Sequence, residues 1–219
     1  MIYFLADDHY GMRPGAKLFE VLNDRYSFVF RENNLHCLTE PEFRKCQLLV
    51  LNLIAGTGGA VLPGAAIEHP LRAYIETARP LLLLHGASAA FWHWDWWRSI
   101  VGYRWVRNED PDSFPASTHP TRPYQVKIAK CRHPLCKKLS PLDLPEDEIY
   151  IHLEQTTAAM TLLETTTDEG TFPQAWETMT PWGGRIIGFL PGHRREVVTH
   201  PDVVANVSTL IDYLLTPQR

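Results

Sequence analysis

Short apolar runs and amphipathic segments alternate along the first half of the chain. Ile2–Ala6, residues 48–53 and Leu81–Leu84 are apolar runs that end in polar residues, which is typical of strands buried on both faces of a parallel sheet. Residues 27–30 are a weaker strand candidate. Residues 65–78 carry an apolar face at helical spacing. The alternation predicts an α/β fold with a doubly wound, mostly parallel, flavodoxin-like sheet and helices on both faces.

The second half of the chain is less regular. Residues 124–129, 149–154, 160–164 and 185–190 have the composition of strands and add an antiparallel part to the sheet. Residues 108–123 are rich in Pro, Asp, Ser and Thr, which predicts a surface loop or a flap beside a site. After Pro201, apolar residues repeat at helical spacing and predict an amphipathic helix that covers the sheet. We expect residues 1–219 to form one domain.

Charge and hydropathy exclude several classes of protein. With 21 Lys and Arg against 25 Asp and Glu, the chain has no overall field that attracts nucleic acid or an anionic membrane. The apolar start is broken at once by Asp7 and Asp8, unlike a secretion signal, and no run reaches the ~18 apolar residues of a membrane span. We therefore expect a cytoplasmic protein with neither a nucleic acid nor a membrane as its partner.

The four cysteines lack the paired spacing of a zinc knuckle. In a chain of this size we expect Cys37, Cys46, Cys131 and Cys136 to be free thiols in a reducing cytosol. A zinc clip built from Cys131, His133 and Cys136 is the alternative. No second pair of ligands follows it, which favours a structural or incidental role.

Three histidines follow predicted strands. In doubly wound sheets the site lies beyond the carboxyl ends of the strands, so His9, His85 and His193 are the strongest candidates for chemistry. Each alone could instead cap or pack. At the turn after residue 84, small residues let the chain start a helix, which puts His85 at an elbow near backbone N–H groups that favour an anion. There the helix dipole would keep His85 neutral, and Ser88 would cap the helix.

Other polar and aromatic residues are weaker candidates. The aromatic run around Trp92 would surround a helix, either as core and interface or as a wall on which a sugar stacks. Three consecutive carboxylates, residues 146–148, precede a predicted strand, where mutual repulsion could raise one pKa; a solvated turn is the alternative. His119 and His133, each followed by proline, are further imidazoles in extended segments or turns.

An ordered set of motifs resembles the ThuA-like family of trehalose utilisation, and it spans nearly the whole chain. Its members are His9, Leu84-His85-Gly86-Ala87, Gly102, His119-Pro120, His133-Pro134, residues 147–150, Trp176, Gly184-Arg185 and Gly192-His193. The resemblance implies a class I glutamine-amidotransferase-like fold. Amidotransferases carry a cysteine at the elbow and a partner histidine after a later strand; here His85 replaces the cysteine and His193 is in the partner's place. We expect no glutaminase activity.

The resemblance implies an enzyme of carbohydrate catabolism that acts on a disaccharide, a glycoside or its 3-keto derivative. His85 and His193 would be acid and base, with Glu148 tuning one of them. The expected substrate-binding residues are His9, Ser88, Trp92, His133, Tyr150 and Arg185. A divalent metal such as zinc, held by His9, His85 and His193, would use the same site. The alternative is a non-catalytic sugar-binding or accessory subunit, and either protein could form a homo-oligomer. The 108–118 insertion departs from the family.

Overall fold

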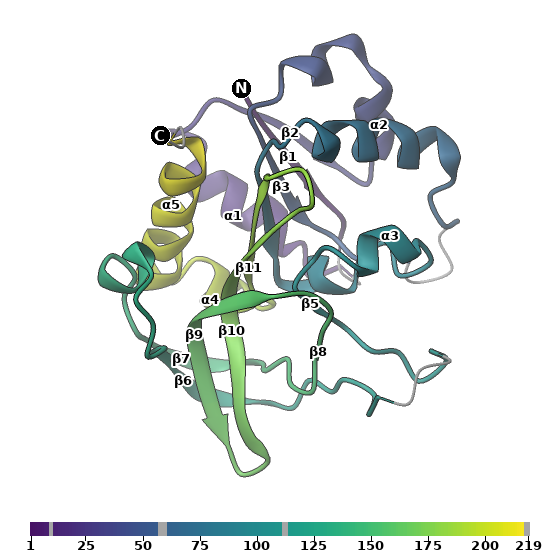
Figure 1. Cartoon of the computed structure of the whole chain (residues 1–219). Helices are drawn as coiled ribbons and strands as arrows, with labels where there is room; N and C mark the ends of the chain where they lie inside the picture. Colours follow the sequence, from purple (N-terminus) through teal and green to yellow (C-terminus); the bar gives the residue numbers. More distant parts are fainter. Residues whose placement is uncertain (9–10, 57–60, 111–113, 217–219) are drawn as a thin grey trace.

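Five parallel strands form one half of the main sheet. The computed structural model describes residues 1–8, 11–56, 61–110 and 114–216. The parallel strands are β1 (Ile2–Ala6), β2 (Phe28–Glu32), β3 (Leu48–Asn52), β4 (Leu81–Leu84) and β11 (Arg185–Phe189). They lie in the order β2-β1-β3-β4-β11 (Figure 1), which is the flavodoxin-like order. This half confirms the predicted fold class.

Antiparallel strands extend the sheet from β11. They are β10 (Gly170–Met179), β9 (Ala159–Thr167), β6 (Thr121–Ile128) and β7 (Leu142–Glu148), in that order. The described part of the main sheet therefore has nine strands. A separate pair, β5 (Tyr103–Arg104) with β8 (Glu154–Gln155), joins the chain before the insertion to the segment after β7. An antiparallel part is therefore confirmed, although residues 185–190, predicted together with it, form β11, which runs parallel to β4.

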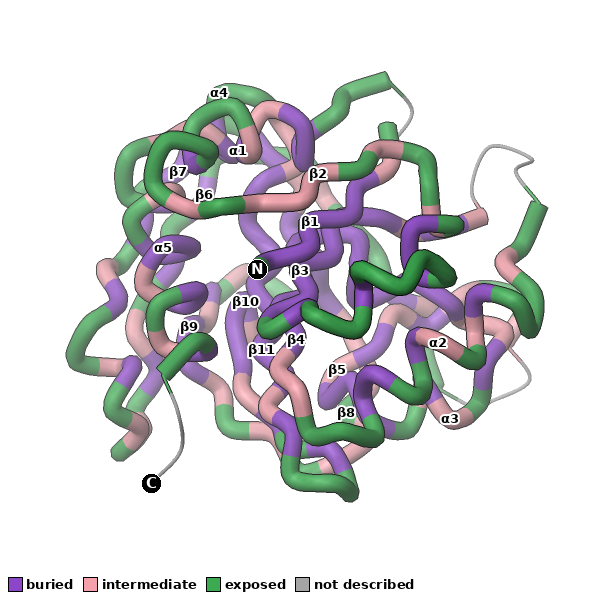
Figure 2. The backbone as a smooth tube through the Cα atoms, turned by 90° about the horizontal axis from the view of Figure 1, so that it is seen from above, coloured by how far each residue is buried: buried purple, intermediate pink, exposed green. Residues whose placement is uncertain are grey.

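Helices cover both faces of the parallel half (Figure 1). The helices α1 (Pro14–Leu22) and α5 (Pro201–Leu215) pack on one face, where Leu18 and Leu210 share a core with Phe4. On the other face α2 (Ala65–Glu76) packs with the 3-10 turns η1 (Leu35–Thr39) and η2 (Pro41–Lys45). Figure 2 shows the central parallel strands buried between these layers, whereas the edge strand β2 is only partly buried. The amphipathic spacing of α2 and α5 thus predicted both helices correctly.

One strand prediction in the second half was wrong, and two strands of the main sheet, β7 and β10, were not predicted. Residues 149–154 form no strand apart from a bridge at Ile151 and the first residue of β8, although Ile149 and Ile151 are fully buried. Instead, the acidic segment before them is the end of β7, an edge strand that tolerates Pro145. The sequence analysis also missed β10. Its Trp176 packs against β11 so closely that a Cβ at Gly188 would lie 2.2 Å from the indole.

The segment after β4 is not a regular α-helix. The 3-10 turn η3 (His85–Ala89) follows the strand directly, and a single helical turn, α3 (Asp95–Arg98), comes later. Between them Phe91 has a left-handed backbone, φ 51°, which interrupts any helix. Most of the aromatic run is core: Phe91, Trp94 and Trp97 are buried against α2 and the sheet. A helix surrounded by aromatic residues was therefore the wrong prediction.

The cysteines also differ from the prediction. Cys131 and Cys136 form a disulfide, whereas Cys37 and Cys46 are free and buried. Cys131 precedes η4 (Pro134–Lys137) and Cys136 lies within it, and the turn brings these residues, five apart in sequence, to a Cα–Cα distance of 6.7 Å. Within the described ranges, no helix is both long and apolar enough to cross a membrane.

Candidate active site

His85 occupies a strained turn at the carboxyl end of β4. Its backbone is left-handed, φ 47°, a conformation that a residue with a bulky side chain adopts only when its surroundings impose it. The imidazole is 1% exposed, and its Nδ1–H donates to the Leu190 carbonyl oxygen, 2.9 Å away, just after β11. Because a carbonyl can only accept, this bond fixes the proton on Nδ1 and turns Nε2 toward the other polar groups. The predicted elbow is present, with a 3-10 turn in place of an α-helix.

Three side chains from distant parts of the chain meet Nε2 of His85. His193 Nδ1 lies 3.1 Å away, the Tyr150 hydroxyl 3.3 Å and Glu148 Oε2 3.4 Å. The same Glu148 oxygen lies 3.7 Å from His193 Nδ1. A single N–H on His85 can serve only one of these neighbours, so the group can share and move a proton. We call His85, Glu148, Tyr150 and His193 the His85 cluster.

Asp147, which the sequence analysis did not single out, positions His193. Its side chain is fully buried and accepts three consecutive backbone N–H groups, from Gly192, His193 and Arg194, at 2.9–3.1 Å. These bonds fasten the loop after β11 to the end of β7. Strand alternation then directs the next residue, Glu148, to the opposite side, where it enters the cluster. The acidic run is neither a solvated turn nor a set of equivalent carboxylates.

The electrostatics of the cluster oppose two predictions from sequence. Burial lowers the pKa of the His85 imidazole, but the hydrogen bond to Glu148 and the negative charges of Asp147 and Glu148 outweigh it, and the pKa is raised. Burial raises the pKa of the Glu148 carboxyl, but the hydrogen bond and charge of His85, followed by His193 and His119, lower it below its ordinary value. His85 is therefore biased toward imidazolium, and Glu148 toward carboxylate.

Trp105 and His119 form an aromatic wall beside the His85 cluster. In the sequence they lie on either side of the 108–118 insertion. Trp105 lies at the start of this excursion and His119 at its end; their rings are 5.6 Å apart, and Trp105 packs edge-on to Tyr150 at 4.8 Å. His119 Nδ1 also lies 3.4 Å from Glu148 Oε1. Sequence analysis ranked His119 low and missed Trp105.

Buried polar contacts fix the base of the insertion. Ser117 bonds with Val106 through its backbone and its hydroxyl, at 2.9 and 2.8 Å. Arg104, which is 4% exposed, forms ion pairs with Glu154 and Asp110. Burial raises the pKa of the Asp110 carboxyl, but the hydrogen bond from the Arg107 N–H and the Arg104 guanidinium together outweigh burial and lower it. These bonds hold Trp105 and His119 in place.

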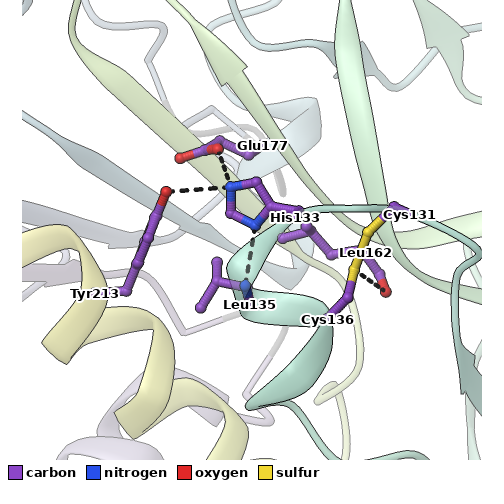
Figure 3. Close-up of a disulfide and its surroundings, with 7 residues drawn as sticks. All are labelled: Cys131, His133, Leu135, Cys136, Leu162, Glu177 and Tyr213. Atoms are coloured by element: carbon purple, nitrogen blue, oxygen red, sulfur yellow. Dashed lines mark hydrogen bonds and ion pairs between the residues drawn. A yellow bond between two sulfur atoms is a disulfide. The ribbon is translucent and has the colours of Figure 1, made fainter.

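Other predicted site residues lie elsewhere. Arg185 begins β11, whereas His193 follows the other end of that strand. The five residues of β11 span roughly 16 Å, which separates Arg185 from the His85 cluster. Arg185 stacks on Tyr213 at 4.5 Å, and His133 lies 2.7 Å from Glu177 and 3.1 Å from the Tyr213 hydroxyl, on the α5 side of the sheet (Figure 3). These contacts connect Arg185 and His133 with α5 and β10 and not with the His85 cluster.

The remaining predicted residues have different outcomes. The Trp92 ring is covered on one face by the Arg107 guanidinium, 4.1 Å away, and lies beside Gly56. Gly56 lines a cleft of about 910 Å³ beyond the carboxyl ends of β1 and β3. Ser88 is buried in η3 and does not cap it; its hydroxyl has no hydrogen-bond partner among the described residues. His9 lies outside the described residues.

The donor atoms of the His85 cluster also fit a divalent cation. Among the described residues, His85, Glu148 and His193 can each present one ligand atom, all within 4.8 Å of one another. The three separations, 3.1, 3.4 and 3.7 Å, are close to the ~3.3 Å between ligands of a tetrahedral zinc ion with bonds of about 2.0 Å. The Leu190 carbonyl that accepts from Nδ1 of His85 is the kind of outer contact that orients a metal-binding imidazole.

Comparisons with known proteins give one family match and several matches of fold. A family model described as trehalose utilisation, ThuA, matches residues 5–214. A ThuA-like protein of Parabacteroides merdae superposes with a TM-score of 0.76 at 15% identity, covering 100% of this chain and 91% of the other. A ThuA-like protein of Bacteroides uniformis gives 0.72 at 16%, covering 98% and 91%.

A more distant fold match is a cytoplasmic protein of Salmonella typhimurium, with a TM-score of 0.59 at 11% identity, covering 92% of this chain and 87% of the other. No curated protein matches the chain by sequence.

Proposed function

The chain belongs to the ThuA trehalose-utilisation family, and from that premise we propose that it is an enzyme of carbohydrate catabolism. Its substrate would be a disaccharide or glycoside, most readily in the 3-keto form, and its chemistry would be proton transfer next to the ketone. The observation that carries the proposal is the convergence of two imidazoles, a carboxylate and a phenol on one buried point. An accessory subunit that only bound sugar would not need such a group.

The electrostatics support a division of labour between the two imidazoles. His85, biased toward imidazolium by Glu148 and Asp147, would donate a proton to the ketone oxygen. His193, held by the Asp147-anchored loop, would remove the C–H proton on the neighbouring carbon. The enol formed could return its O–H proton to His85 while it expels an alkoxide one carbon further on, which takes the proton held by His193; this cleaves a 3-keto glycoside. Alternatively, the enol could take the proton back at another carbon, which isomerises it. Glu148 would keep the charge of the imidazolium compensated.

The aromatic wall supports a sugar as the substrate. Trp105 presents a partly exposed indole next to Tyr150 and His119, and aromatic faces bind the apolar C–H surfaces of sugar rings. The sequence analysis assigned this role to Trp92, but Arg107 already stacks on that ring. We therefore propose Trp105 as the sugar-stacking residue.

Two histidine variants test the proposal. Purified protein would be incubated with a panel of disaccharides and their 3-keto forms, and the products followed by mass spectrometry. We expect His193→Ala to lower turnover by about 10²–10⁴-fold, the usual contribution of a general acid or base. His133→Ala is the matched control, because it removes an imidazole outside the cluster, and it should keep turnover within a few-fold. Full activity in His193→Ala would contradict the role proposed for His193, and tight sugar binding without turnover by the wild type would contradict the enzyme.

A second candidate mechanism uses a divalent metal, and the donor triangle of His85, Glu148 and His193 supports it. A bound cation would polarise the ketone, while His119 and Tyr150 remain beside it to move protons. Protein purified without an affinity tag would be assayed by elemental analysis. About one equivalent of metal, lost in His85→Ala and kept in His133→Ala, supports the metal mechanism. Full activity in chelator with less than about a tenth of an equivalent supports the metal-free one.

We propose the cytoplasm as the compartment, as described for the Salmonella protein of the same fold. Fractionation of cells of the source organism tests this directly, and recovery of the chain outside the cytoplasm would contradict it.

A further inference from the structure

The Cys131–Cys136 disulfide lies beside a groove that is separate from the His85 cluster. The groove has a volume of about 1120 Å³ and runs between residues 129–132, the start of β9 and the end of β10. Cys131 is part of its lining, whereas the Cys136 sulfur points inward and lies 3.9 Å from the buried Leu162 carbonyl oxygen (Figure 3). Both cysteines are partly exposed. Of the two cysteines, Cys131 is the one that lines the groove, and both also pack against the core.

Exposed cations flank both ends of the disulfide. Lys130 and Arg132 stand on either side of Cys131 and line the groove, and Lys137 and Lys138 follow Cys136 directly. The groove also contains two carboxylates, Glu164 and Glu177, of which Glu177 is paired with His133. Positive charge near a cysteine stabilises its thiolate and attracts anionic thiols. The other two cysteines are the opposite case: Cys37 and Cys46 are 0% and 1% exposed, and burial raises the pKa of the Cys37 thiol to about 11.

The ring closed by the disulfide contains His133, which links three elements. From η4 this imidazole reaches Glu177 of β10 and Tyr213 of α5. The disulfide therefore fastens a contact between the antiparallel strands and the last helix. A disulfide that closes so short a ring restricts the unfolded chain less than a long-range one, and exposed disulfides are the ones that exchange most readily.

We propose that Cys131–Cys136 is a thiol–disulfide exchange site that reacts with small anionic thiols of the glutathione class, bound in the groove by Lys130 and Arg132. The thiolate of the incoming molecule bonds to Cys131 Sγ, and the disulfide breaks with its electron pair going to Cys136 Sγ, which takes a proton from water. A second small thiolate then attacks the small-molecule sulfur of the mixed disulfide, the oxidised dimer leaves, and Cys131 Sγ keeps the electron pair and takes a proton from water. The balance is one protein disulfide and two small thiols converted to two cysteine thiols and one small disulfide.

The first test compares thiols of opposite charge on the full-length native protein. Reduced glutathione and cysteamine would be applied at equal thiolate concentration in low salt, quenched by alkylation and analysed by peptide mass spectrometry. We expect glutathione to open Cys131–Cys136 about tenfold faster, and this advantage to shrink in 1 M salt, where the screening length is about 3 Å. Lys130→Glu with Arg132→Glu should reverse the preference. Cys37 and Cys46 should stay unlabelled throughout, as internal controls.

The second test identifies the sulfur that is attacked. Cys136→Ser leaves Cys131 facing the groove and should trap a stable mixed disulfide with oxidised glutathione. Cys131→Ser leaves the inward Cys136 and should trap at least about tenfold less. Equal trapping on both variants, equal rates with both thiols, or reduction of the wild type only under denaturing conditions would each overturn the proposal and identify a structural staple. Because the charge comparison uses wild-type protein, it decides the matter even if a variant fails to fold.

Discussion

Two clusters with the same three side-chain types lie in different parts of the molecule. Each combines a histidine, a glutamate and a tyrosine hydroxyl that come from separate elements. In the His85 cluster, which also contains His193, these three residues are His85, Glu148 and Tyr150. In the other cluster they are His133, Glu177 and Tyr213. Sequence analysis assigned both histidines to one site. Composition alone does not separate a reactive cluster from a structural one.

The difference lies in what the backbone does to the second ring nitrogen. In His85, Nδ1–H donates to a carbonyl, so Nε2 is left to face three side chains. In His133, Nδ1 accepts the Leu135 N–H at 3.2 Å, so a neutral ring carries its proton on Nε2 and points it at Glu177. His133 also has an ordinary backbone, φ −67°, as the N-cap of η4, whereas His85 is strained. His133 thus has one fixed partner set for each ring nitrogen, whereas Nε2 of His85 faces His193, Tyr150 and Glu148 at once.

The largest effect should come from breaking the anchor of the His85 cluster. Asp147→Ala leaves three backbone N–H groups without their acceptor, and we expect it to lower the free energy of unfolding by about 3–5 kcal/mol. Urea denaturation measures this. Glu146→Gln is the matched control: it removes only the exposed pair with Arg194 and should cost less than about 1 kcal/mol. Equal losses in the two variants would mean that the loop holds its shape without Asp147.

The charge pair within the cluster should give a stability difference that depends on pH. The raised pKa of His85 contributes stability that is complete below its ordinary value of 6.5 and is lost as pH rises through the raised value. The lowered pKa of Glu148 contributes stability that is complete above 4.5 and is lost as pH falls through the lowered value. The unfolding free energy of wild type minus Glu148→Gln should therefore be largest between pH 4.5 and 6.5, at about 1–3 kcal/mol.

The control for this measurement is Glu169→Gln, which removes the exposed partner of His152. Solvent screens that pair, so its effect should stay below about 1 kcal/mol. A Glu148→Gln difference that is flat from pH 4 to pH 9 would show that the ion pair does not form.

The smallest effect concerns backbone strain. Asparagine tolerates the left-handed conformation better than histidine does. The relief of strain in His85→Asn should therefore offset part of the free energy of unfolding that is lost with the imidazole ring. His133→Asn has no such strain to relieve. We expect His85→Asn to cost roughly 1 kcal/mol less than His133→Asn in urea denaturation, although His85 is the more buried residue. The opposite order would mean that the turn at His85 stores no strain.

Much of the site's location was predictable, but its membership was not. His85 and His193 were named because both follow strands of the parallel half. There an apolar run predicts both that a strand forms and where it ends. Glu148 and Tyr150 were named as well, although a strand was predicted over residues 149–154 and the observed strand, β7, ends at Glu148. Asp147 was missed because its role depends on accepting backbone N–H groups from a loop 45 residues away, which no local pattern records. Trp105 was missed because nothing in sequence places residue 105 beside residue 119.

The pattern of apolar and polar residues by itself determined the parallel sheet, its helices and the elbow at His85, because burial of local runs requires no knowledge of distant partners. The tertiary structure alone decided which histidine meets several polar side chains at one ring nitrogen. The carbonyl of Leu190 and the N–H of Leu135 set opposite proton positions on His85 and His133, and Glu148 and Asp147 diverge because an edge strand alternates its side chains. The proximity of Cys131 and Cys136 was likewise a product of the turn between them, since spacing alone does not show whether two thiols meet.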